Sequence, residues 1–567
     1  MNGLVGRWLL LEENPAAERL AQSLGLPMAI ARVLTNRGIV DEREAEIFLH
    51  GSWTETPSPF LFSDLKPALN RLNEAVEKKE KIIIFGDYDA DGILALVMLY
   101  RALRSLGAVV DYYIPDRIKE GYGLKSAHLE LIEQRGAKVV VTVDCGIKAN
   151  SFVERAQRRG IDVIITDHHQ PGDEVPLATA VLNPHLVNSG YPFKYLTGVG
   201  VAFKLVQAIL EAKGKKSLLS HYTKLVAIGT VTDVAPLIGE NRLLVRHGLK
   251  TLSETRNLGL KNLLNVSGLH GERITEWDVG YRLGPRVNAA GRMASADLAV
   301  RLFLTDSLEE AASLAAKLNE LNNERQQAEE KILGQALTSI EKGRLAEKYR
   351  VLILGCEAWH RGIIGIVASR LKEQFHRPVI LFSYENERGH GSGRSISSFS
   401  LIQALHQCGH LFEEFGGHPH AAGCILRREK IAELKAALNV LGQTWLREED
   451  LRPTLIIDCP LRFSELSKAF LEAYSSLAPF GPGNPRPLFL FSGVKVVGKT
   501  QAANNRFTRL SLEQDGRVFE GTLWDTPGRP LPLEAGARIS LVASPQISHF
   551  WGEETLSLNI EDWGPIK

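Results

Sequence analysis

Residues 81–92 read KIIIFGDYDADG, an apolar run of strand length followed at once by three carboxylates at alternate positions. The stretch that follows, ILALVMLYRALRSLG, has the length of a helix and ends in glycine. A strand, an acidic turn and a helix in this order are typical of βαβ units. This part of the sequence therefore predicts an α/β domain built on a parallel sheet.

Further apolar, β-branched runs continue the same pattern. Helical stretches such as HLELIEQRG and NSFVERAQRRG lie between them. The additional strand candidates are VVDYYI, KVVVTV and DVIIT. Because these runs are short and almost wholly apolar, we expect the strands to be buried on both faces of the sheet.

The remaining sequence predicts at least three more parts. Residues up to about 55 favour a small helical lead-in. From about residue 307, apolar residues at helical spacing predict one long amphipathic helix or two, which would connect domains. A second α/β segment starts at YRVLILG and runs to about residue 450. The C-terminal part is rich in short strands and Gly/Pro turns, which favours a small β-barrel or sandwich.

Bulk composition limits the classes of protein that need considering. A length of 567 residues suggests several domains, and 44% hydrophobic with 23% charged residues is ordinary for a globular protein. A net charge of +1 gives no argument for a polyanionic partner. Five scattered cysteines form no CxxC pair, which favours a reducing compartment and no zinc cluster. With a poor signal peptide and no apolar stretch near the ~20 residues of a membrane span, we expect a soluble cytoplasmic protein.

Acidic and imidazole side chains follow three of the predicted strands. In an open α/β sheet the carboxyl ends of the strands line the crevice where ligands bind, so these groups are expected to converge. A further candidate, Asp233 in GTVTD, has no such support from its position alone. The converging groups are Asp87, Asp89 and Asp91 after KIIIFG, Asp144 after KVVVTV, and Asp167, His168 and His169 after DVIIT.

Carboxylates gathered this closely repel one another, and a divalent cation is the natural compensation. Mixed Asp and His ligands suit Mn²⁺, and carboxylates suit Mg²⁺. Two such ions could generate hydroxide and clamp a phosphoryl oxygen. Each motif alone has a plainer interpretation, as an acidic turn or Ca²⁺ loop, a strand end, or a helix cap with solvated histidines. The coincidence at three strand ends favours the metal centre.

The motifs DYDADG, VTVDCGI, ITDHH and GTVTDVAPL, in this order, resemble those of the DHH phosphoesterase superfamily. Within it, the chain is similar to the RecJ family of single-strand-specific DNA exonucleases over nearly its whole length. YRLGPRVNAAGRM, WHRGIIGIVASRL, GSGRS and FGGHPHAAG carry the likeness beyond the first domain. The resemblance implies a DHH domain joined by a long helix to a DHHA1 α/β domain, followed by an OB-fold β-barrel.

The resemblance also implies roles for the acidic and imidazole groups. His169 would contact phosphate or orient a ligand, Asp91 would shape the turn or hold a metal-bound water, and Asp167 would orient a histidine. Asp144 would bridge two ions. The direct metal ligands would be Asp87, Asp89, Asp144, His168 and Asp233.

Substrate contacts are expected from three further motifs, GSGRS, GGHPHAAG and GPRVNAAGR. GSGRS places an arginine between small residues, and its guanidinium suits bidentate phosphate binding. GGHPHAAG could instead be a tight turn with solvated histidines. GPRVNAAGR could instead be an ordinary loop with helix-capping residues. The expected contacts are Ser392, Arg394, Ser395, His418 and His420. For Arg286, Asn288 and Arg292, contact with the strand and the ordinary loop are equally supported by the sequence.

The implied reaction is metal-dependent hydrolysis of single-stranded DNA from the 5′ end, releasing 5′-mononucleotides during repair and recombination. The site would lie in a cleft between the DHH and DHHA1 domains. The OB domain would guide the strand through some of a set of aromatic and basic residues. These are Phe507, Phe519, Trp524, Phe550, Trp551, Arg506 and Arg509.

Two competing functions remain at this point: a DHH phosphodiesterase for short oligonucleotides and a non-catalytic DHH scaffold. Family partners would be single-strand-binding protein, a helicase or mismatch-repair proteins, with no membrane and a monomeric chain. The expected domains are a lead-in at 1–60, the DHH domain at 61–300, the connecting helix at 301–345, DHHA1 at 346–450 and the OB fold at 451–567.

Overall fold

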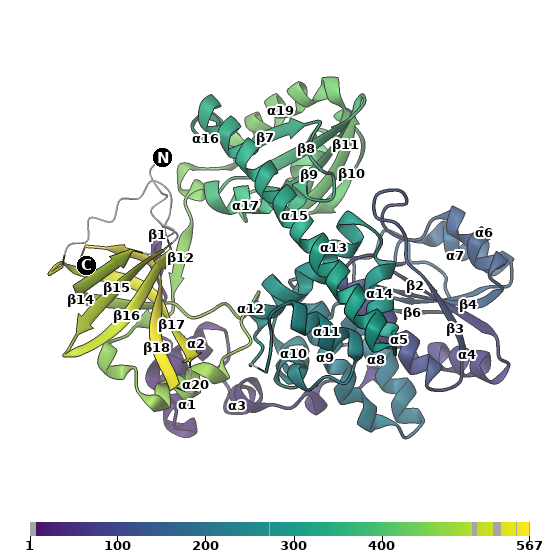
Figure 1. Ribbon diagram of the computed structural model, residues 1–567, viewed down its shortest axis with the longest axis horizontal. Helices are drawn as coiled ribbons and strands as arrows, with labels where there is room; N and C mark the ends of the chain where they lie inside the picture. The colour runs from purple at the N-terminus through teal and green to yellow at the C-terminus, as the bar shows by residue number, and fades with distance from the viewer. Residues whose placement is uncertain (1–6, 272, 502–506, 525–534, 551–552, 566–567) are drawn as a thin grey trace. The chain divides into compact units, whose positions relative to one another are not determined.

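The chain forms two compact units, whose helices and strands are labelled in Figure 1. The computed structural model describes residues 7–271, 273–501, 507–524, 535–550 and 553–565. The first unit comprises residues 50–327 and 478–485, and the second comprises the described parts of 1–49, 328–477 and 486–567. None of the helices in these ranges is long and apolar enough to cross a membrane.

A five-stranded, all-parallel sheet organises the first unit. This confirms the parallel α/β fold predicted from the apolar runs. Its spatial order is β3 (Val109–Tyr113), β2 (Lys81–Gly86), β4 (Ala137–Val143), β5 (Asp162–Thr166) and β6 (Ala180–Leu182).

The strands are buried because their side chains alternate between two apolar layers. Ile82 and Ile84 pack into one cluster, while Ile83 and Phe85 pack into the other. Helices α4 (Leu65–Glu77), α5 (Ala90–Arg104), α8 (Gly198–Ala212) and α9 (Leu219–Thr232) contribute to the first layer, and α6 (Ser126–Gln134) and α7 (Asn150–Arg158) to the second. Both faces are covered, as a parallel sheet requires.

The strand order places a crevice between β2 and β4. From β2 the chain moves to β3 on one side, and the later strands add on the other side. Such a reversal of direction is where open α/β sheets bind ligands. Asp87 follows β2 and Asp144 follows β4, so the two acidic strand ends flank this point.

The remainder of the first unit is helical. Helix α10 (Gly239–Lys250) packs on α9, and α13 (Gly284–Met293) and α14 (Asp297–Leu304) follow. Helix α15 (Leu308–Gly343) then runs for 36 residues without a break, so the predicted connector is one helix, not two. Residues 478–485 return to this unit from far along the chain: Pro482 O accepts a hydrogen bond from Leu237 N, and Pro479 O accepts one from buried Arg242.

The second unit contains a mixed five-stranded sheet. Its order is β10 (Phe412–His418), β11 (Ala421–Arg427), β9 (Arg388–Arg394), β8 (Val379–Glu385) and β7 (Leu352–Cys356). Only β7 and β8 are parallel. Helices α17 (Ile364–Phe375) and α19 (Ile431–Trp445) accompany this sheet and make it the second α/β segment that the sequence predicts.

The C-terminal strands of the second unit form a closed barrel rather than a sandwich. The long strands β14 (Phe489–Gln501) and β17 (Arg538–Phe550) pair with each other and close the sheet. Between them the order continues through β15 (Phe507–Gln514), β16 (Arg517–Trp524) and β18 (Glu553–Gly564). Closure leaves few edges open to other strands.

The lead-in contains a strand that the sequence did not predict. Helices α1 (Ala16–Leu24), α2 (Met28–Asn36) and α3 (Glu42–His50) match the expected helical character, but β1 (Arg7–Leu10) precedes them and pairs in parallel with β12 (Thr454–Ile457). Trp8 Nε1 also donates to Asp562 at 2.7 Å. A four-residue strand whose partner lies in a distant part of the sequence leaves no periodic signal of its own.

Candidate metal centre and substrate pocket

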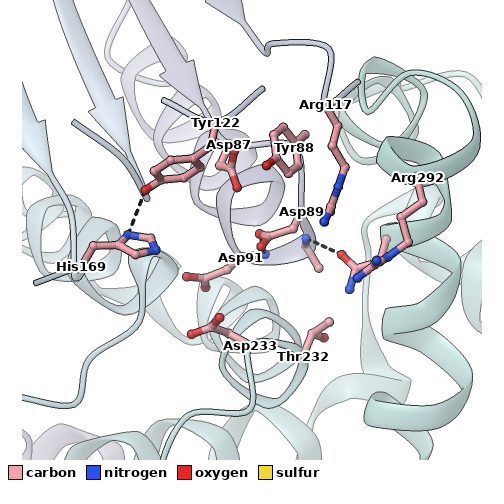
Figure 2. A pocket seen from close by; sticks show the side chains of 12 residues that line it. Asp87, Tyr88, Asp89, Asp91, Arg117, Tyr122, His169, Thr232, Asp233 and Arg292 are labelled. Carbon is pink, nitrogen blue, oxygen red and sulfur yellow. Dashed lines mark hydrogen bonds between the residues drawn. The ribbon is translucent and has the colours of Figure 1, made fainter. Parts of the chain in front are cut away.

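Four acidic or imidazole segments meet at the crevice between β2 and β4 (Figure 2). Asp87 extends β2, Asp144 extends β4, and His168 and His169 follow β5. Asp233 directly follows the last residue of α9 and lies at the same pocket. The structure thus brings together all the acidic and imidazole residues singled out in the sequence, Asp233 included.

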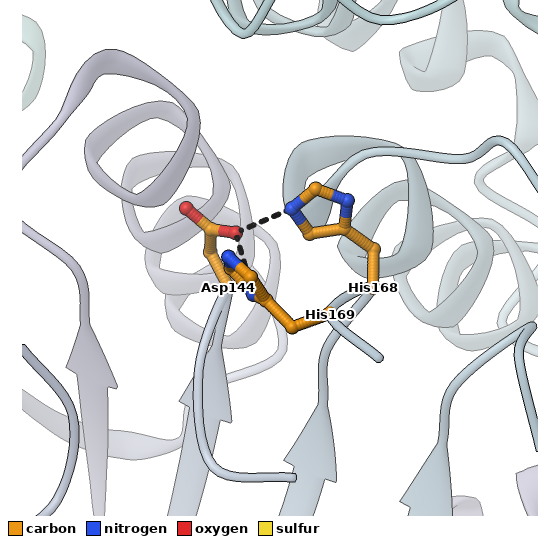
Figure 3. Close-up of side chains that lie close together, drawn as sticks. All are labelled: Asp144, His168 and His169. Carbon is orange, nitrogen blue, oxygen red and sulfur yellow. Dashed lines mark ion pairs between the residues drawn. The ribbon is translucent and has the colours of Figure 1, made fainter. Parts of the chain in front are cut away.

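The ligand atoms form three overlapping groups, in each of which they lie within 4.8 Å of one another. His168 Nε2 lies 3.1 Å from Asp144 Oδ1, and His169 Nδ1 lies 3.9 Å from the same oxygen (Figure 3). Asp144 belongs to two of the groups and His168 to two, which suits residues shared between two cations. The groups are Asp87–Asp89–Asp144, Asp91–His168–Asp233 and Asp144–His168–His169.

The cluster carries more negative charge than its surroundings compensate. Burial, together with the neighbouring carboxylates, raises the pKa of Asp87, Asp144 and Asp233 well above the usual range. Burial and the charge of Asp89 raise the pKa of Asp91 to about 7. The buried Oδ1 of Asp87 accepts no hydrogen bond from any residue that the structure describes. A buried, unpartnered carboxylate oxygen inside an acidic cluster fits a hard divalent cation.

Asp167 serves the site indirectly. Its Oδ1 contacts His169 Nδ1 at 2.8 Å and accepts from the backbone N–H groups of His168 and His169. Its Oδ2 accepts from Ile147 N at 2.9 Å. Burial alone would raise the pKa of Asp167, but these contacts lower it. The carboxylate therefore stays charged and fixes the orientation of the His169 ring, the role that the sequence suggested for it.

Asp91 also has a defined structural partner. Its carboxylate accepts hydrogen bonds from the backbone N–H groups of Gly198 at 2.6 Å and Val199 at 3.1 Å, at the first turn of α8. Asp89 caps α5 in the same way, with Oδ1 accepting from Asp91 N and Gly92 N. The acidic motif thus positions two helices as well as offering oxygens to a cation.

Backbone strain accompanies two of these candidate ligands. Asp144 has φ of +60°, and Val234, next to Asp233, also has φ of +60°. Left-handed backbone is costly for residues other than glycine and persists where the surrounding structure enforces it. Here it turns the chain sharply after β4 and after α9, which presents the Asp144 and Asp233 side chains to the crevice.

The opposite side of the pocket is basic and was not anticipated in full. A cavity of about 300 Å³ is lined on one side by the carboxylates and on the other by Arg117, Asn288 and Arg292. Arg117 lies over the Tyr88 ring, 4.8 Å from its centroid. Sequence reasoning missed Arg117, Tyr88, Tyr122 and Thr232. Arg117 and Tyr122 lie several residues beyond β3, too far from the strand end for the argument that found Asp87 to single them out.

Tyr122 contacts His169 at the same ring nitrogen as Asp167. Its hydroxyl lies 3.0 Å from His169 Nδ1 (Figure 2) and donates to Asp144 O at 3.1 Å. With Asp167 at the same ring nitrogen, Nδ1 is fully engaged. Although burial opposes a charge on the ring, the contact with Asp167 raises the pKa of His169. The ring is therefore prepared to donate a hydrogen bond from Nε2 to an anion in the pocket.

The three candidates from GPRVNAAGR have different surroundings in the structure. Arg292 and Asn288 line the pocket, and Asn288 Oδ1 also accepts from Ala90 N at 2.8 Å, which fixes the start of α5. Arg286 is absent from the pocket lining. Its Nε donates to Asn319 Oδ1 at 3.0 Å, and its Nη1 donates to Arg282 O. Among the described contacts, Arg286 therefore joins α13 to α15.

The GSGRS and GGHPHAAG residues lie in the second unit. Ser392 and Arg394 stand on β9 beside the first turn of α17, where a Cβ on Gly365 would come within 2.8 Å of Ser392 Oγ and 3.2 Å of Arg394 Nη2. Ser395 is buried and donates to Phe399 O at 2.7 Å, so its hydroxyl is committed to the fold. His418 and His420 are exposed at the β10–β11 turn. Their contact with substrate stays a prediction.

The aromatic and basic candidates of the barrel also differ in their surroundings. Phe519 packs edge-on against buried Phe463. Phe507 and Trp524 face each other across β15 and β16, Arg509 lies over the Phe507 ring, and Trp524 is 58% exposed. Arg506 and Trp551 lie outside the described residues, as does the side chain of Phe550.

Comparison with known protein families accounts for most of the chain. The DHH family N-terminal domain matches residues 81–230, the DHHA1 domain matches 348–441, and the RecJ OB domain matches 457–562. The chain is 36% identical over 564 residues to the single-stranded-DNA-specific exonuclease RecJ of Bacillus subtilis, covering 98% of this chain and 70% of that protein. It is 34% identical over 567 residues to RecJ of Escherichia coli, covering 95% and 96%.

Solved structures agree with this assignment. RecJ of Thermus thermophilus in complex with Mn²⁺ aligns with a TM-score of 0.85 at 29% identity, covering 99% of this chain and 80% of that one. An exonuclease RecJ bound to manganese aligns with a TM-score of 0.60 at 35% identity, covering 68% and 96%. The expected combination of DHH, DHHA1 and OB domains is confirmed.

Proposed function

The chain belongs to the RecJ family, and from that premise we propose that it is an exonuclease that degrades single-stranded DNA from the 5′ end and releases 5′-mononucleotides. The observation that supports this most directly is the two-sided pocket. A cluster of carboxylates, whose pKa values are raised by burial and by their mutual repulsion, faces Arg117 and Arg292 across one cavity. Such a cavity suits a phosphodiester held between cations and guanidinium groups.

The cofactors proposed are Mn²⁺ or Mg²⁺, because the related Thermus protein forms complexes with each. We assign their binding to Asp87, Asp89, Asp144, His168 and Asp233, the residues that supply the three ligand groups together with Asp91 and His169. When bound, the ions would activate water and neutralise charge on the phosphoryl oxygens. Asp167 would act only by holding His169.

The chain's own residues position the substrate. Arg117 and Arg292 would each offer a guanidinium fork to phosphate oxygens, and Asn288 would hold the start of α5 in place between them. His169, aligned by Asp167 and Tyr122, would donate from Nε2 to the scissile phosphate. As the developing charge grows on that phosphate, these fixed donors stabilise it without having to reorganise.

The other parts of the chain would act on the same strand. We propose that Ser392, Arg394, His418 and His420 in the segment at 346–450 contact the DNA backbone, and that the barrel at 451–567 guides the strand. Ser395 is committed to the fold and would support Arg394. Single-strand-binding protein, a helicase and mismatch-repair proteins are the proposed partners, acting with a monomer in the bacterial cytoplasm. Residues 61–300 would then form the catalytic domain, with the lead-in at 1–60 and the connector at 301–345.

Exonuclease polarity tests this function. A single-stranded 30-mer, labelled at the 5′ end in one sample and at the 3′ end in another, is incubated with and without Mn²⁺. We expect immediate release of labelled mononucleotide from the 5′ end only, and only with metal. Hydrolysis confined to dinucleotides would move the protein to the phosphodiesterases of short oligonucleotides. Strand binding with no hydrolysis under any metal would leave a scaffold.

A further inference from the structure

Two large aromatic side chains are exposed on the helical segment that leads to the pocket-lining residues of α13. Trp277 is 55% exposed and Tyr281 is 69% exposed. Their rings stack on each other with centroids 5.2 Å apart and an interplanar angle of 25°. Exposing two stacked aromatics leaves apolar area in water that burial would otherwise stabilise, so the pair indicates a ligand.

The pair lies on the same helical segment as the basic side of the pocket. Helix α12 (Glu276–Asp278) carries Trp277, a π-helical turn (Val279–Leu283) carries Tyr281, and α13 follows without a break and carries Asn288 and Arg292. Asn288 and Arg292 line the pocket, so one continuous backbone segment joins the stacked rings to it.

Two glycines of α13 hold this segment against the candidate metal centre. A Cβ on Gly284 would lie 2.6 Å from Thr232 Oγ1, and one on Gly291 would lie 2.4 Å from Tyr88 O. Thr232 and Tyr88 both line the pocket. Because the helix backbone is fixed this closely, the aromatic pair has a defined position relative to the carboxylates. A π-helical turn of this kind often marks a functional position in a helix.

Cationic groups near the pair are committed to the protein. Burial lowers the pKa of Arg286, and the nearby guanidinium groups of Arg282 and Arg325 lower it further. Arg282 Nη1 donates to Asp278 at 3.1 Å, and Arg286 Nε donates to Asn319 Oδ1 at 3.0 Å. The exposed ring faces are what this segment offers to a strand, and stacking of bases on such faces is tolerant of sequence.

We propose that Trp277 and Tyr281 form a base-stacking platform for the DNA strand whose terminal phosphodiester lies in the pocket. This inference rests on the proposed function and adds a second binding site for the same strand. Tyr281 and Arg292 are eleven positions apart, which corresponds to about 16 Å of helix. A stacked strand advances ~3.4 Å per nucleotide, so the platform would meet a base no more than about five nucleotides from the scissile bond.

Two paired variants test the platform. Trp277→Ala with Tyr281→Ala removes both rings, and Trp277→Phe with Tyr281→Phe keeps aromatic faces. On a 20-mer, we expect the alanine pair to lower kcat/KM by about five- to a hundred-fold through KM, the range that one or two base–aromatic stacks supply. The phenylalanine pair should recover most of this loss. On a dinucleotide, which does not reach the platform, both pairs should match the unaltered protein.

A matched control removes two other exposed aromatics of the same unit. Phe60 is 57% exposed and Tyr195 is 51% exposed, and neither lines the pocket. Phe60→Ala with Tyr195→Ala should leave hydrolysis of both substrates unchanged. A scan with a single abasic nucleotide then locates the platform. The unaltered protein should lose affinity when the abasic position reaches the rings, and the alanine pair should be insensitive there.

Either of two results would overturn the platform: unchanged hydrolysis of the 20-mer by the alanine pair, or an equal loss on the 20-mer and the dinucleotide. Failure of the proposed function can be distinguished from failure of the platform. If the unaltered protein hydrolyses no DNA, binding of a labelled 20-mer is measured by fluorescence anisotropy. Weaker binding by the alanine pair would then support the platform. Equal binding would assign the exposed rings to a protein partner and reject the proposal.

Discussion

A Cβ atom built on Gly198 would lie 2.4 Å from the Cβ of Asp144 and 2.6 Å from its Oδ1. Both separations are shorter than van der Waals contact permits, so the first residue of α8 must lack a side chain for Asp144 to keep its position. Asp144 is 2% exposed and its backbone is already left-handed, which leaves it little freedom to move away. The glycine therefore defines where the Asp144 carboxylate lies.

We expect Gly198→Ala to displace Asp144 and reduce nuclease activity at least about a hundred-fold, the upper range for losing the support of a metal ligand. Activity and Mn²⁺ affinity, measured by calorimetry, would both fall. Gly200→Ala in the same helix is the control, since its Cβ would meet only side-chain atoms of Leu196, at 3.1 Å, and Thr197. Comparable activity in the two variants would show that Asp144 tolerates the shift.

The two roles of Asp89 can be separated by two substitutions. Asp89→Asn removes the charge but keeps an oxygen that can cap α5, whereas Asp89→Ala removes both. We expect both variants to lose at least about a hundred-fold in activity. In the metal-free protein, the free energy of unfolding measured in urea should be about 1 kcal/mol higher for the asparagine variant than for the alanine variant. Full activity of either variant would remove Asp89 from the metal centre.

The metal-free protein should lose stability as pH rises. Burial and neighbouring carboxylates raise the pKa of Asp87, Asp144 and Asp233, and bring that of Asp91 to about 7. In the unfolded chain these groups lose their protons near pH 4. Between about pH 4 and 7 the folded state thus binds more protons, and its stability falls as pH increases.

Metal binding should reverse this trend, because cations and protons compete for the same oxygens. We expect the increase in Tm on adding Mn²⁺ to be larger at pH 8 than at pH 5.5, as measured by differential scanning fluorimetry. Asp144→Asn should reduce that increase at pH 8. An increase in Tm independent of pH would mean that the carboxylates do not bind the ion.

Arg117 should affect substrate binding more than stability. Arg117→Ala removes a guanidinium that lies over Tyr88 at the open pocket, and we expect KM for a single-stranded oligonucleotide to rise about ten- to a hundred-fold. Tyr88→Phe keeps the ring beneath Arg117 and should behave like the unaltered protein. A change confined to kcat would instead place Arg117 at the transition state alone.

The acidic half of the pocket could be predicted because strand ends of a parallel sheet share one edge. Asp87, Asp144 and His168 each follow an apolar run that the sequence shows clearly. The basic half could not be predicted in the same way. Arg117 lies several residues beyond β3, in a polar segment without periodicity, and its position depends on its stacking over Tyr88.

Motifs show that a residue is present but not what it touches. Arg286 and Ser395 belong to stretches typical of substrate contact, yet the structure gives both a partner within the protein, at Asn319 and Phe399. Strand β1 was missed for a related reason: its partner, β12, lies more than four hundred residues away in the chain. Long-range pairing decides such elements, and local sequence does not carry it.

Residues 478–485 also set an order of events during synthesis. The first unit is otherwise complete at residue 327, but buried Arg242 and the backbone N–H of Leu237 have hydrogen-bond partners at Pro479 and Pro482. A ribosome needs roughly 8 to 30 s to cover the intervening residues. During that interval the nascent unit lacks these contacts, so the nuclease reaches its finished form only after most of the second unit has been translated.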